Sequence, residues 1–292
     1  MDNIVIAFRD ALQSAFGQLD WLPVPDGEIH RFRVPDDKSG SQNGWYIIYP
    51  DGIASGAFGS WKTGGTNTWC SREPVDAREA EQVRQRIEQA RRQREAEQHQ
   101  RQQAAAEYAN RLWRDARRAD PDHPYLLAKG VRPYGLRQRG DELLVPLYAD
   151  GALVNLQRIK PDGSKRFLFG GRIKGSYSPL GSITLGKPLL VCEGWATGAT
   201  LHANGYTAAC AMNAGNLTPV ALALRANHPN IEIIIAGDDD RMTEGNPGRT
   251  AANAAAIACG GLVTFPEWPA DSPQSLTDFN DLAAWSRQHE QA

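Results

Sequence analysis

The length, composition and charge of the chain set the first limits on its class. With 292 residues, of which 41% are hydrophobic, the chain is long enough for two domains with buried cores. Its net charge of −2 gives no overall attraction to nucleic acid, so any such binding must come from local patches. Its longest apolar runs have the length of strands, so we expect a cytoplasmic protein with no signal peptide and no membrane partner.

The four cysteines argue against both a zinc ribbon and a disulfide framework. Cys70, Cys192, Cys210 and Cys259 are scattered along the chain, and no two of them form a Cys-x-x-Cys pair. We therefore expect reduced thiols with a structural role.

Residues 1–75 are expected to form a small N-terminal mixed α/β domain. Turn signals such as Pro25-Asp26-Gly27 and Pro50-Asp51-Gly52 separate short aromatic runs that are typical of strands. Basic and aromatic residues interleave here: Arg31, Arg33 and Lys62 with Phe32, Trp45, Tyr49, Phe58, Trp61 and Trp69. This mixture fits a stacking platform for single-stranded nucleic acid, such as a template, and it fits the aromatic core of a small sheet equally well.

The next segment, residues 76–120, is predicted to be a charged helical linker. Asp76 is a helix cap with Glu79 three residues on, as in a capping box, and Asp120-Pro121 ends the helix. Apolar positions are sparse in its first half and no heptad pattern is sustained. We therefore expect an exposed spacer and not a coiled coil.

Residues 121–187 are predicted to be rich in strands and in basic side chains. Strand-like runs at 143–148, 154–157 and 166–169 are divided by Asp150-Gly151 and Pro161-Asp162-Gly163, which are typical of hairpin turns. Basic residues outnumber acidic ones between 150 and 187, which favours binding to the phosphates of a nucleic acid or a nucleotide. The candidates are Arg158, Lys165, Arg166, Arg172 and Lys174. The alternative is an ordinary basic surface.

From residue 188 onward, strand and helix patterns alternate. Strands are expected near 188–192, 207–211, 231–236 and 262–265, and helices near 195–204, 218–227, 247–258 and 278–288. This alternation predicts a parallel sheet with right-handed crossovers.

Acidic residues follow two of these predicted strands. Glu193 comes directly after one, and Gly237 with Asp238, Asp239 and Asp240 comes after another. Ligands of such sheets gather outside the carboxyl ends of the strands, so we expect Glu193, Asp238 and Asp240 to converge. Carboxylates this close repel one another unless a hard cation such as Mg²⁺ neutralises them, which indicates metal-assisted phosphoryl or nucleotidyl transfer. The alternative for the Asp-rich loop is turn formation and helix capping.

Together these residues resemble the Toprim domain shared by primases and topoisomerases. The resemblance rests on Glu193-Gly194, on Asp238-x-Asp240, and on Asp278-Phe279-Asn280-Asp281 near the end. More narrowly, residues 193–198 are similar to the Glu-Gly-Tyr-Ala-Thr-Ala motif of primases carried by conjugative plasmids and satellite phages, with Trp195 and Gly198 as departures.

Two upstream segments extend the resemblance. Residues 125–130 are similar to the Tyr-Leu-x-x-Arg-Gly segment that opens primase polymerase cores, and Lys165-Arg166-Phe167-Leu168 with Gly170-Gly171 resembles the basic strand of plasmid primases. The implied fold class is α/β: a Toprim-like parallel sheet flanked by helices over 188–292, preceded by a β-rich basic subdomain over 121–187, a long charged helix and a small N-terminal mixed α/β domain. No zinc-binding cysteine cluster precedes the core, so we do not expect a zinc module of this chain to recognise a template start site.

The resemblance implies a DNA primase, a DNA-directed RNA polymerase that makes short RNA primers by nucleotidyl transfer with Mg²⁺ or Mn²⁺. Glu193 would act as metal ligand or general base, and Asp238 and Asp240 would hold the metal. Asp278 and Asp281 would complete a second metal site, with helix capping as the alternative. The expected partners are a single-stranded DNA template, ribonucleoside triphosphates and, where one exists, a replicative helicase or single-strand binding protein.

Two other functions use the same residues. A Toprim nuclease would direct the acidic set to hydrolysis, and a DNA-binding or regulatory protein would keep the fold without catalysis. A topoisomerase is disfavoured, because a chain of this length leaves little room for a gate and a transesterifying tyrosine module.

Overall fold

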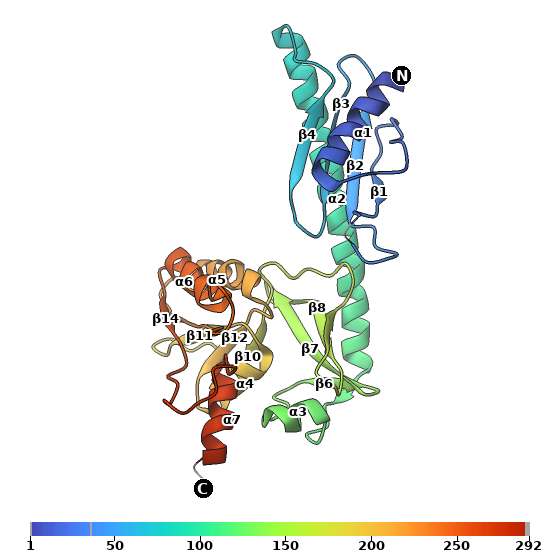
Figure 1. Cartoon of the computed structure of the whole chain (residues 1–292). Coiled ribbons are helices and arrows are strands. Elements are labelled where there is room, and N and C mark those ends of the chain that lie inside the picture. Colours follow the sequence, from blue (N-terminus) through green and yellow to red (C-terminus); the bar gives the residue numbers. More distant parts are fainter. Residues whose placement is uncertain (1, 36, 290–292) are drawn as a thin grey trace. The chain divides into compact units, whose positions relative to one another are not determined.

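The computed structural model describes residues 2–35 and 37–289, which fold into two compact units (Figure 1). The first unit ends at Gln100 and the second begins at Arg101. This division falls inside the longest helix, α2 (Ala77–Asp115), so each unit contains a part of that helix.

The first unit is built around an antiparallel sheet of four strands in sequential order. Its elements are α1 (Asp2–Phe16), β1 (His30–Phe32), β2 (Gly44–Tyr49), β3 (Ser55–Ser60) and β4 (Thr66–Cys70). Every residue of β2 is buried, because successive side chains point to opposite faces and both faces are covered. Tyr46 and Ile48 pack with Phe8 of α1, while Trp45 and Ile47 pack with Ala90 of α2.

The aromatic residues of the first unit therefore belong to its core. Phe32, Trp45, Tyr49 and Phe58 are buried, as the core interpretation predicts. The neighbouring cations also have partners within the unit: Arg31 lies 3.8 Å from Glu97, and Lys62 lies 2.9 Å from Asp37.

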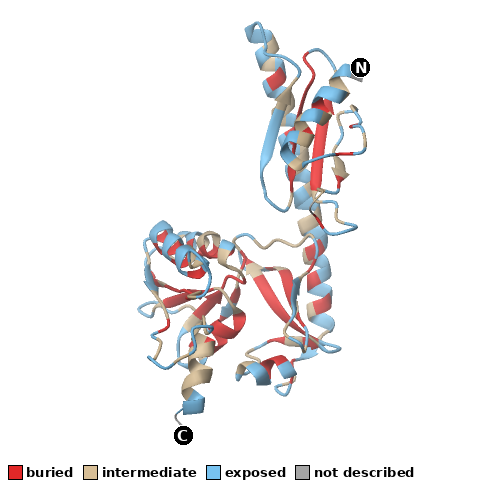
Figure 2. Ribbon diagram, in the orientation of Figure 1, coloured by how far each residue is buried: buried red, intermediate tan, exposed pale blue. Residues whose placement is uncertain are grey.

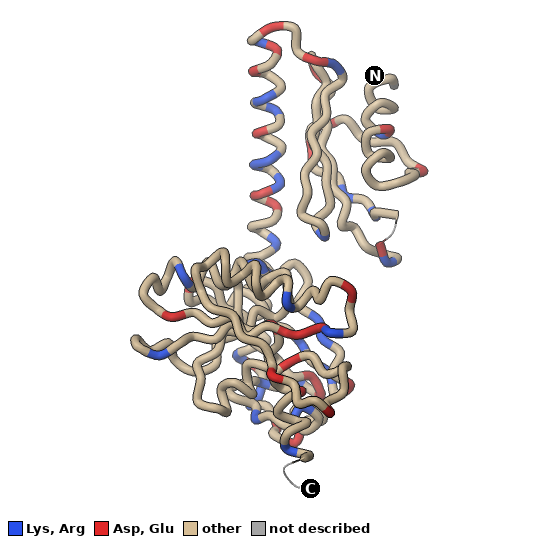
Figure 3. The backbone as a smooth tube through the Cα atoms, turned by 60° about the vertical axis from the view of Figure 1, so that its left-hand side comes forward, with Lys and Arg blue, Asp and Glu red and all other residues tan. Residues whose placement is uncertain are grey.

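Helix α2 begins as the sequence predicts. The Asp76 side chain accepts a hydrogen bond from the Glu79 amide at 2.8 Å, and the Glu79 carboxylate accepts one from the Val75 amide at 3.0 Å. Acidic and basic residues are interspersed along the helix (Figure 3).

The expectation that α2 is an exposed spacer is wrong for one stripe of the helix in each unit. Val83 and Ala90 are buried in the first unit, and Ala109 and Leu112 are buried in the second. Much of this buried stripe is alanine. The spacing of large apolar residues in the sequence therefore did not predict it.

The second unit begins with an antiparallel sheet in the order β5-β6-β7-β8-β9. Its elements are β5 (Arg117–Arg118), α3 (Pro124–Lys129), β6 (Arg137–Arg139), β7 (Glu142–Ala149), β8 (Ala152–Ile159) and β9 (Lys165–Phe167). The predicted turn at Asp150-Gly151 joins β7 to β8. Both residues have positive φ, 51° and 77°, which suits the twist of a two-residue hairpin.

A five-stranded sheet follows in the order β10-β12-β11-β13-β14. Its strands are β10 (Ser178–Leu180), β11 (Leu189–Cys192), β12 (Thr207–Cys210), β13 (Ile233–Ala236) and β14 (Leu262–Thr264). The last four are parallel to one another, which confirms the predicted parallel sheet. The antiparallel edge strand β10 was not predicted, because it is three residues long and contains Pro179.

Helices cover both faces of this sheet. They are α4 (Trp195–Ala203), α5 (Leu217–Asn227), α6 (Pro247–Cys259) and α7 (Phe279–His289), with a short 3₁₀ turn at Ala214–Asn216. Leu190 and Cys192 face the α4 side, and Leu189 and Val191 face α5 and α6. The strands of the sheet are buried except at its edge, as the red ribbons of Figure 2 show.

The two sheets of the second unit share one hydrophobic core. Leu143 and Leu147 of the antiparallel sheet and Tyr125 of α3 belong to the same buried cluster as Ala199 of α4 and Leu190 of β11. This shared core fixes the basic sheet against the parallel one. No helix in the described part of the chain is both long and apolar enough to cross a membrane. All four cysteines are free thiols.

Candidate active site

The carboxyl ends of two neighbouring parallel strands define the site. Strands β11 and β13 pair in parallel, with Cys192 opposite Ala236. Glu193 and Asp238 follow these positions by one and two residues, so both emerge at the same edge of the sheet. We call the carboxylates that gather here the acidic cluster: Glu193, Asp238, Asp240, Asp278 and Asp281.

Asp238 is the most perturbed member of the cluster. Burial, together with the negative charges of Glu193 and the other three carboxylates, raises the pKa of its carboxyl to about 8. Its Oδ1 atom is buried and has no hydrogen-bond partner in the described chain. A buried carboxylate oxygen without a partner is costly, so this atom is available for a ligand.

Glu193 is half-buried beside Asp238. Burial raises the pKa of Glu193, and the charge of Asp240 raises it further. The backbone N–H of Ala214 and the ammonium of Lys165 act in the opposite direction.

The three consecutive aspartates play different structural roles. Asp239 is buried and turned into the protein, where its carboxylate accepts hydrogen bonds from Trp268 Nε1 at 3.0 Å and Asn246 Nδ2 at 2.8 Å. Asp240 Oδ2 accepts a hydrogen bond from the Gly248 amide in the first turn of α6 at 2.8 Å. The capping interpretation thus applies to Asp240, although its charge still acts on Glu193 and Asp238.

Asp278 and Asp281 form a reciprocal cap at the start of α7. Asp278 Oδ1 accepts a hydrogen bond from the Asp281 amide at 2.8 Å, and Asp281 Oδ2 accepts one from the Thr277 amide at 3.1 Å. Both carboxylates nevertheless lie close enough to raise the pKa of Asp238. Capping therefore holds them at the site.

Two lysines lie next to the acidic cluster. Lys165, the first residue of β9, lies over the ring of Tyr125, 5.6 Å from its centroid. Lys165 is exposed, yet the protein around its ammonium lowers its pKa, and Lys129 lowers it further. Glu193, Asp238 and Asp278 oppose this shift. Lys129 Nζ lies 3.5 Å from Asp281 Oδ1.

Lys129 and Asn280 were missed as site residues by the sequence argument. The fully buried Asn280 donates hydrogen bonds from Nδ2 to the Lys129 carbonyl at 2.8 Å and to Thr200 Oγ1 at 2.9 Å. It therefore ties α7 to α3 and α4. A signal was present, because Lys129 and Asn280 both lie in segments that carry the Toprim primase resemblance.

The other basic candidates have different neighbours. Arg158 lies 3.4 Å from Glu142, and Arg172 lies 3.5 Å from Asp150. Arg166 is exposed and directly opposite Arg158 in the β8–β9 pair, and Lys174 is exposed in the following loop. Of the five predicted residues, Lys165 has the described link to the acidic cluster.

Gly198, a departure from the primase motif, lies where α4 approaches the sheet most closely. A Cβ at this position would lie 2.2 Å from Cys210 Sγ and 3.2 Å from Cys192 Sγ. The two thiols thus fill the space beneath α4 that an alanine at 198 would need. The neighbouring departure, Trp195, is fully buried in the shared core.

The carboxylates of Glu193 and Asp238 suit a divalent cation that also contacts a substrate. Within the described residues, no three His, Cys, Asp or Glu side chains are arranged to hold a metal ion on their own. Mg²⁺ usually keeps several waters and is held by one or two carboxylates together with substrate phosphates. Glu193 and the unpartnered Oδ1 of Asp238 fit this mode of binding.

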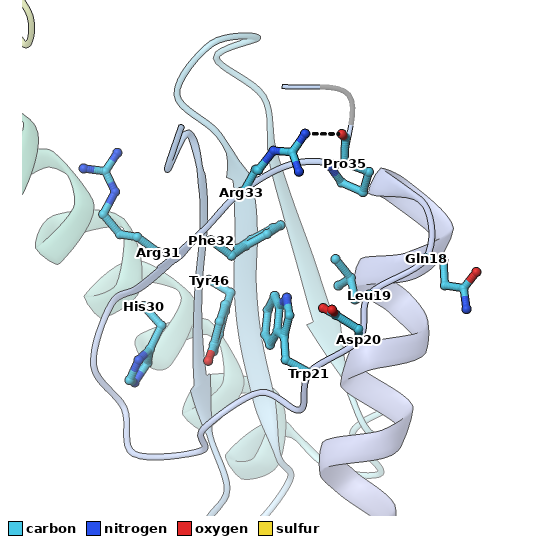
Figure 4. Close-up of a pocket in the computed structure, with 10 residues that line it drawn as sticks. All are labelled: Gln18, Leu19, Asp20, Trp21, His30, Arg31, Phe32, Arg33, Pro35 and Tyr46. Atoms are coloured by element: carbon cyan, nitrogen blue, oxygen red, sulfur yellow. Dashed lines mark hydrogen bonds between the residues drawn. The ribbon is translucent and has the colours of Figure 1, made fainter. Parts of the chain in front are cut away.

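A separate pocket of about 710 Å³ lies in the first unit (Figure 4). The ring of Tyr46 is stacked between those of Trp21 and His30, with centroid distances of 5.4 and 5.2 Å. Arg33 donates hydrogen bonds to the carbonyls of Pro35 and Asp37. This pocket contains none of the acidic cluster, which lies in the second unit.

Comparison with known proteins identifies the domain family of the C-terminal part. Residues 188–286 match the Toprim domain. The C-terminal third of the chain is therefore a Toprim domain, as its sequence motifs and its parallel sheet predict.

The chain also resembles particular proteins. Two curated relatives from Escherichia coli are both named DNA primase TraC. One is 35% identical over 275 residues, which cover 90% of this chain and 19% of the relative. The other is 36% identical over 268 residues, which cover 84% of this chain and 24% of the relative. The chain thus spans about a fifth to a quarter of the length of these relatives.

One solved structure is also similar. It is described as a bacteriophage T7 lagging-strand DNA polymerase interacting with primase domains bound to an RNA/DNA hybrid and dTTP. The match has a TM-score of 0.40 and 17% identity, and it covers 56% of this chain and 86% of the other. The predicted resemblance to Toprim primases is confirmed by the domain match and the curated relatives.

Proposed function

We propose that this chain is a DNA primase, which synthesises short RNA primers on single-stranded DNA by metal-dependent nucleotidyl transfer. The similarity to two proteins named DNA primase supports this reaction. The observation that carries the proposal is the buried, unpartnered carboxylate of Asp238 next to Glu193, with Lys165 and Lys129 close to the same cluster.

Glu193 and Asp238 would hold a divalent cation, Mg²⁺ or Mn²⁺, together with the substrate phosphates. Asp240 is a further candidate ligand of this cation, and Asp278 with Asp281 would contribute to a second site. When bound, such a cation activates the attacking 3′-hydroxyl and stabilises the pyrophosphate leaving group. The raised pKa of Glu193 also suits a general base that accepts the proton of this hydroxyl at neutral pH.

The basic residues bind the charged substrates. Lys165 and Lys129 neutralise the phosphates of the incoming ribonucleoside triphosphate, because they lie beside the carboxylates. The exposed residues farther along the basic sheet hold the template backbone: Arg158, Arg166, Arg172 and Lys174.

The division of labour follows the predicted segments. We propose that the Toprim part at 188–292 supplies the carboxylates, that 121–187 supplies the basic strand, and that residues 1–75 contribute to template binding, joined by the helix over 76–120. A replicative helicase or single-strand binding protein is a further partner of the same proposal, in the cytoplasm.

Primer synthesis on defined single-stranded DNA tests the proposal. Labelled ribonucleotides should enter short products that require template and Mg²⁺ or Mn²⁺, while labelled DNA stays intact. Metal-dependent cutting of the DNA would indicate a Toprim nuclease instead. Salt-sensitive DNA binding without any metal-dependent product would indicate a non-catalytic protein.

A further inference from the structure

The loop after β9 carries a phenylalanine that the protein leaves in solvent. Phe169 is 86% exposed, the highest value among the large hydrophobic residues of the described chain. Its ring therefore does not contribute the favourable free energy that burial would give. An isolated exposed apolar side chain is common on protein surfaces, so its meaning depends on what surrounds it.

The surroundings hold Phe169 outward. Leu168 is buried against the second part of α2, and its amide donates a hydrogen bond to the Leu156 carbonyl at 3.1 Å. Phe167 packs against the shared core on the other side. Because the two preceding residues already fill both sides of the sheet here, Phe169 cannot turn inward without displacing one of them.

The turn that follows is equally fixed. Gly170 has a φ of +77°, which favours glycine. A Cβ at Gly171 would lie 2.4 Å from Cγ of the fully buried Asn155. Asn155 Nδ2 donates a hydrogen bond to the Arg172 carbonyl at 3.2 Å. The exposed ring is thus presented by a loop that is tied to β8.

Cations flank this ring along the chain. Exposed Arg166 precedes it, and Arg172 and exposed Lys174 follow it. The Arg172–Asp150 pair is 3.5 Å apart at the surface, where such pairs contribute little and exchange easily. A ring for bases beside cations for phosphates is the combination by which proteins hold single-stranded nucleic acid.

The position of the ring relates it to the acidic cluster. Lys165, which interacts electrostatically with Glu193 and Asp238, begins the same strand. Phe169 lies in the turn that begins two residues after the end of β9. One short segment of the chain thus carries both the exposed ring and the lysine of the acidic cluster.

We propose that Phe169 is a template-binding residue, which stacks on a base of single-stranded DNA while Arg166, Arg172 and Lys174 bind the adjacent phosphates. That the bound strand is a template rests on the proposed primase function. The stacking contact itself does not depend on that function, so binding measurements alone test it.

The test compares two strands of equal length, oligo-dT and the same strand with abasic sites, in titrations of the full chain without nucleotides or metal. Phe169→Ala should bind oligo-dT about tenfold more weakly, the loss typical of one stacked base. Phe169→Trp should bind as wild type does, and the added indole emission should be quenched by oligo-dT. On the abasic strand, wild type and Phe169→Ala should bind alike.

Matched controls separate stacking from charge and from general surface effects. Ile257 on α6 is 83% exposed, so Ile257→Ala should not weaken binding and Ile257→Trp should show no quenching. Lys174→Ala should reduce the salt dependence of binding by about one counterion, whereas Phe169→Ala should leave the salt slope unchanged.

Three results would overturn the inference: equal binding of oligo-dT by wild type and Phe169→Ala, an equal loss on the abasic strand, or no quenching of Phe169→Trp. The two proposals fail separately. Stacking without primer synthesis would contradict the primase function alone, and primer synthesis with no effect of Phe169 on binding would contradict stacking alone.

Discussion

The two units differ in the surroundings of their charged residues. In the first unit, aromatic residues fill the core and the neighbouring cations find partners, as Lys62 does at 2.9 Å from Asp37. In the second unit, Asp238 is buried among like charges and keeps an oxygen without a partner. Unpaired buried polar atoms also occur in the first unit, at Tyr49 Oη and Ser55 Oγ for example. Asp238 differs because its unpaired oxygen belongs to a carboxyl group that is surrounded by four other carboxylates, which points to a cationic ligand. Aromatic and basic residues thus indicate a core in the first unit, and clustered carboxylates indicate a candidate active site in the second.

The largest expected effect is on catalysis. Glu193→Gln and Asp238→Asn should each lower primer synthesis by roughly a hundredfold or more, because each removes a charge that binds the metal while keeping the side-chain shape. Initial rates with Mg²⁺ and with Mn²⁺ measure this. Asp239→Asn should affect folding more than metal use, because Asp239 is bonded to Trp268 and Asn246. Near-normal rates in both of the first two variants would show that the acidic cluster is not catalytic.

A substitution in the first unit tests whether its aromatic residues form a core. Trp45→Ala should destabilise the first unit by about 3–5 kcal/mol, because it removes a fully buried ring that packs with Ala90 and Arg94. Chemical denaturation followed by limited proteolysis should find residues 1–100 cleaved first. Leu22→Ala, at an exposed position, is the control. An equally stable Trp45→Ala protein would contradict the core assignment.

Close packing beneath the site gives a third prediction. Gly198→Ala should destabilise the chain by about 1–3 kcal/mol, because the new methyl group meets Cys210 Sγ. Cys210→Ala should recover part of that loss in the double variant. A double-mutant cycle by thermal denaturation measures the coupling, and strictly additive effects would mean that the two residues do not share this space.

The pH dependence of stability gives a smaller effect with a definite sign. The pKa of Asp238 rises from 3.8 to about 8 on folding, so the folded chain holds a proton that the unfolded chain releases between these values. This contribution favours folding at low pH and is lost as pH rises through about 8. Asp238→Asn should therefore raise the Tm of the metal-free protein at pH 8 by several degrees and flatten its decline between pH 5 and 9. A lower Tm for this variant at pH 8 would contradict the conclusion that burial and neighbouring carboxylates disfavour the ionised form of Asp238.

The sequence predicted the strand ends of the site because parallel neighbours bring their carboxyl ends together. Glu193 follows β11 directly and Asp238 follows β13 after one glycine, so no long-range information was needed. The roles of single aspartates were less accessible. Asp239 is held by Trp268, 29 residues away, and nothing near the Asp triplet indicates that contact.

The other features that the sequence did not predict also depend on contacts between distant segments. Lys129 meets Asp281 only because α3 and α7 are packed together, 152 residues apart in sequence. The buried stripe of α2 depends on alanines, whose burial follows from packing partners and not from hydrophobic periodicity. Local patterns thus predicted elements and strand ends, while contacts between distant segments decided which charged groups share the site.

Calorimetric titration of Mn²⁺ into the protein at pH 7, in buffers of different ionisation enthalpy, tests the central claim most directly. Because Asp238 carries a proton below about pH 8, the wild-type protein should release close to one proton for each metal bound. Asp238→Asn should bind far more weakly and release none. Metal binding of equal affinity in both proteins, with no proton released, would show that the buried carboxylate of Asp238 is not the metal ligand.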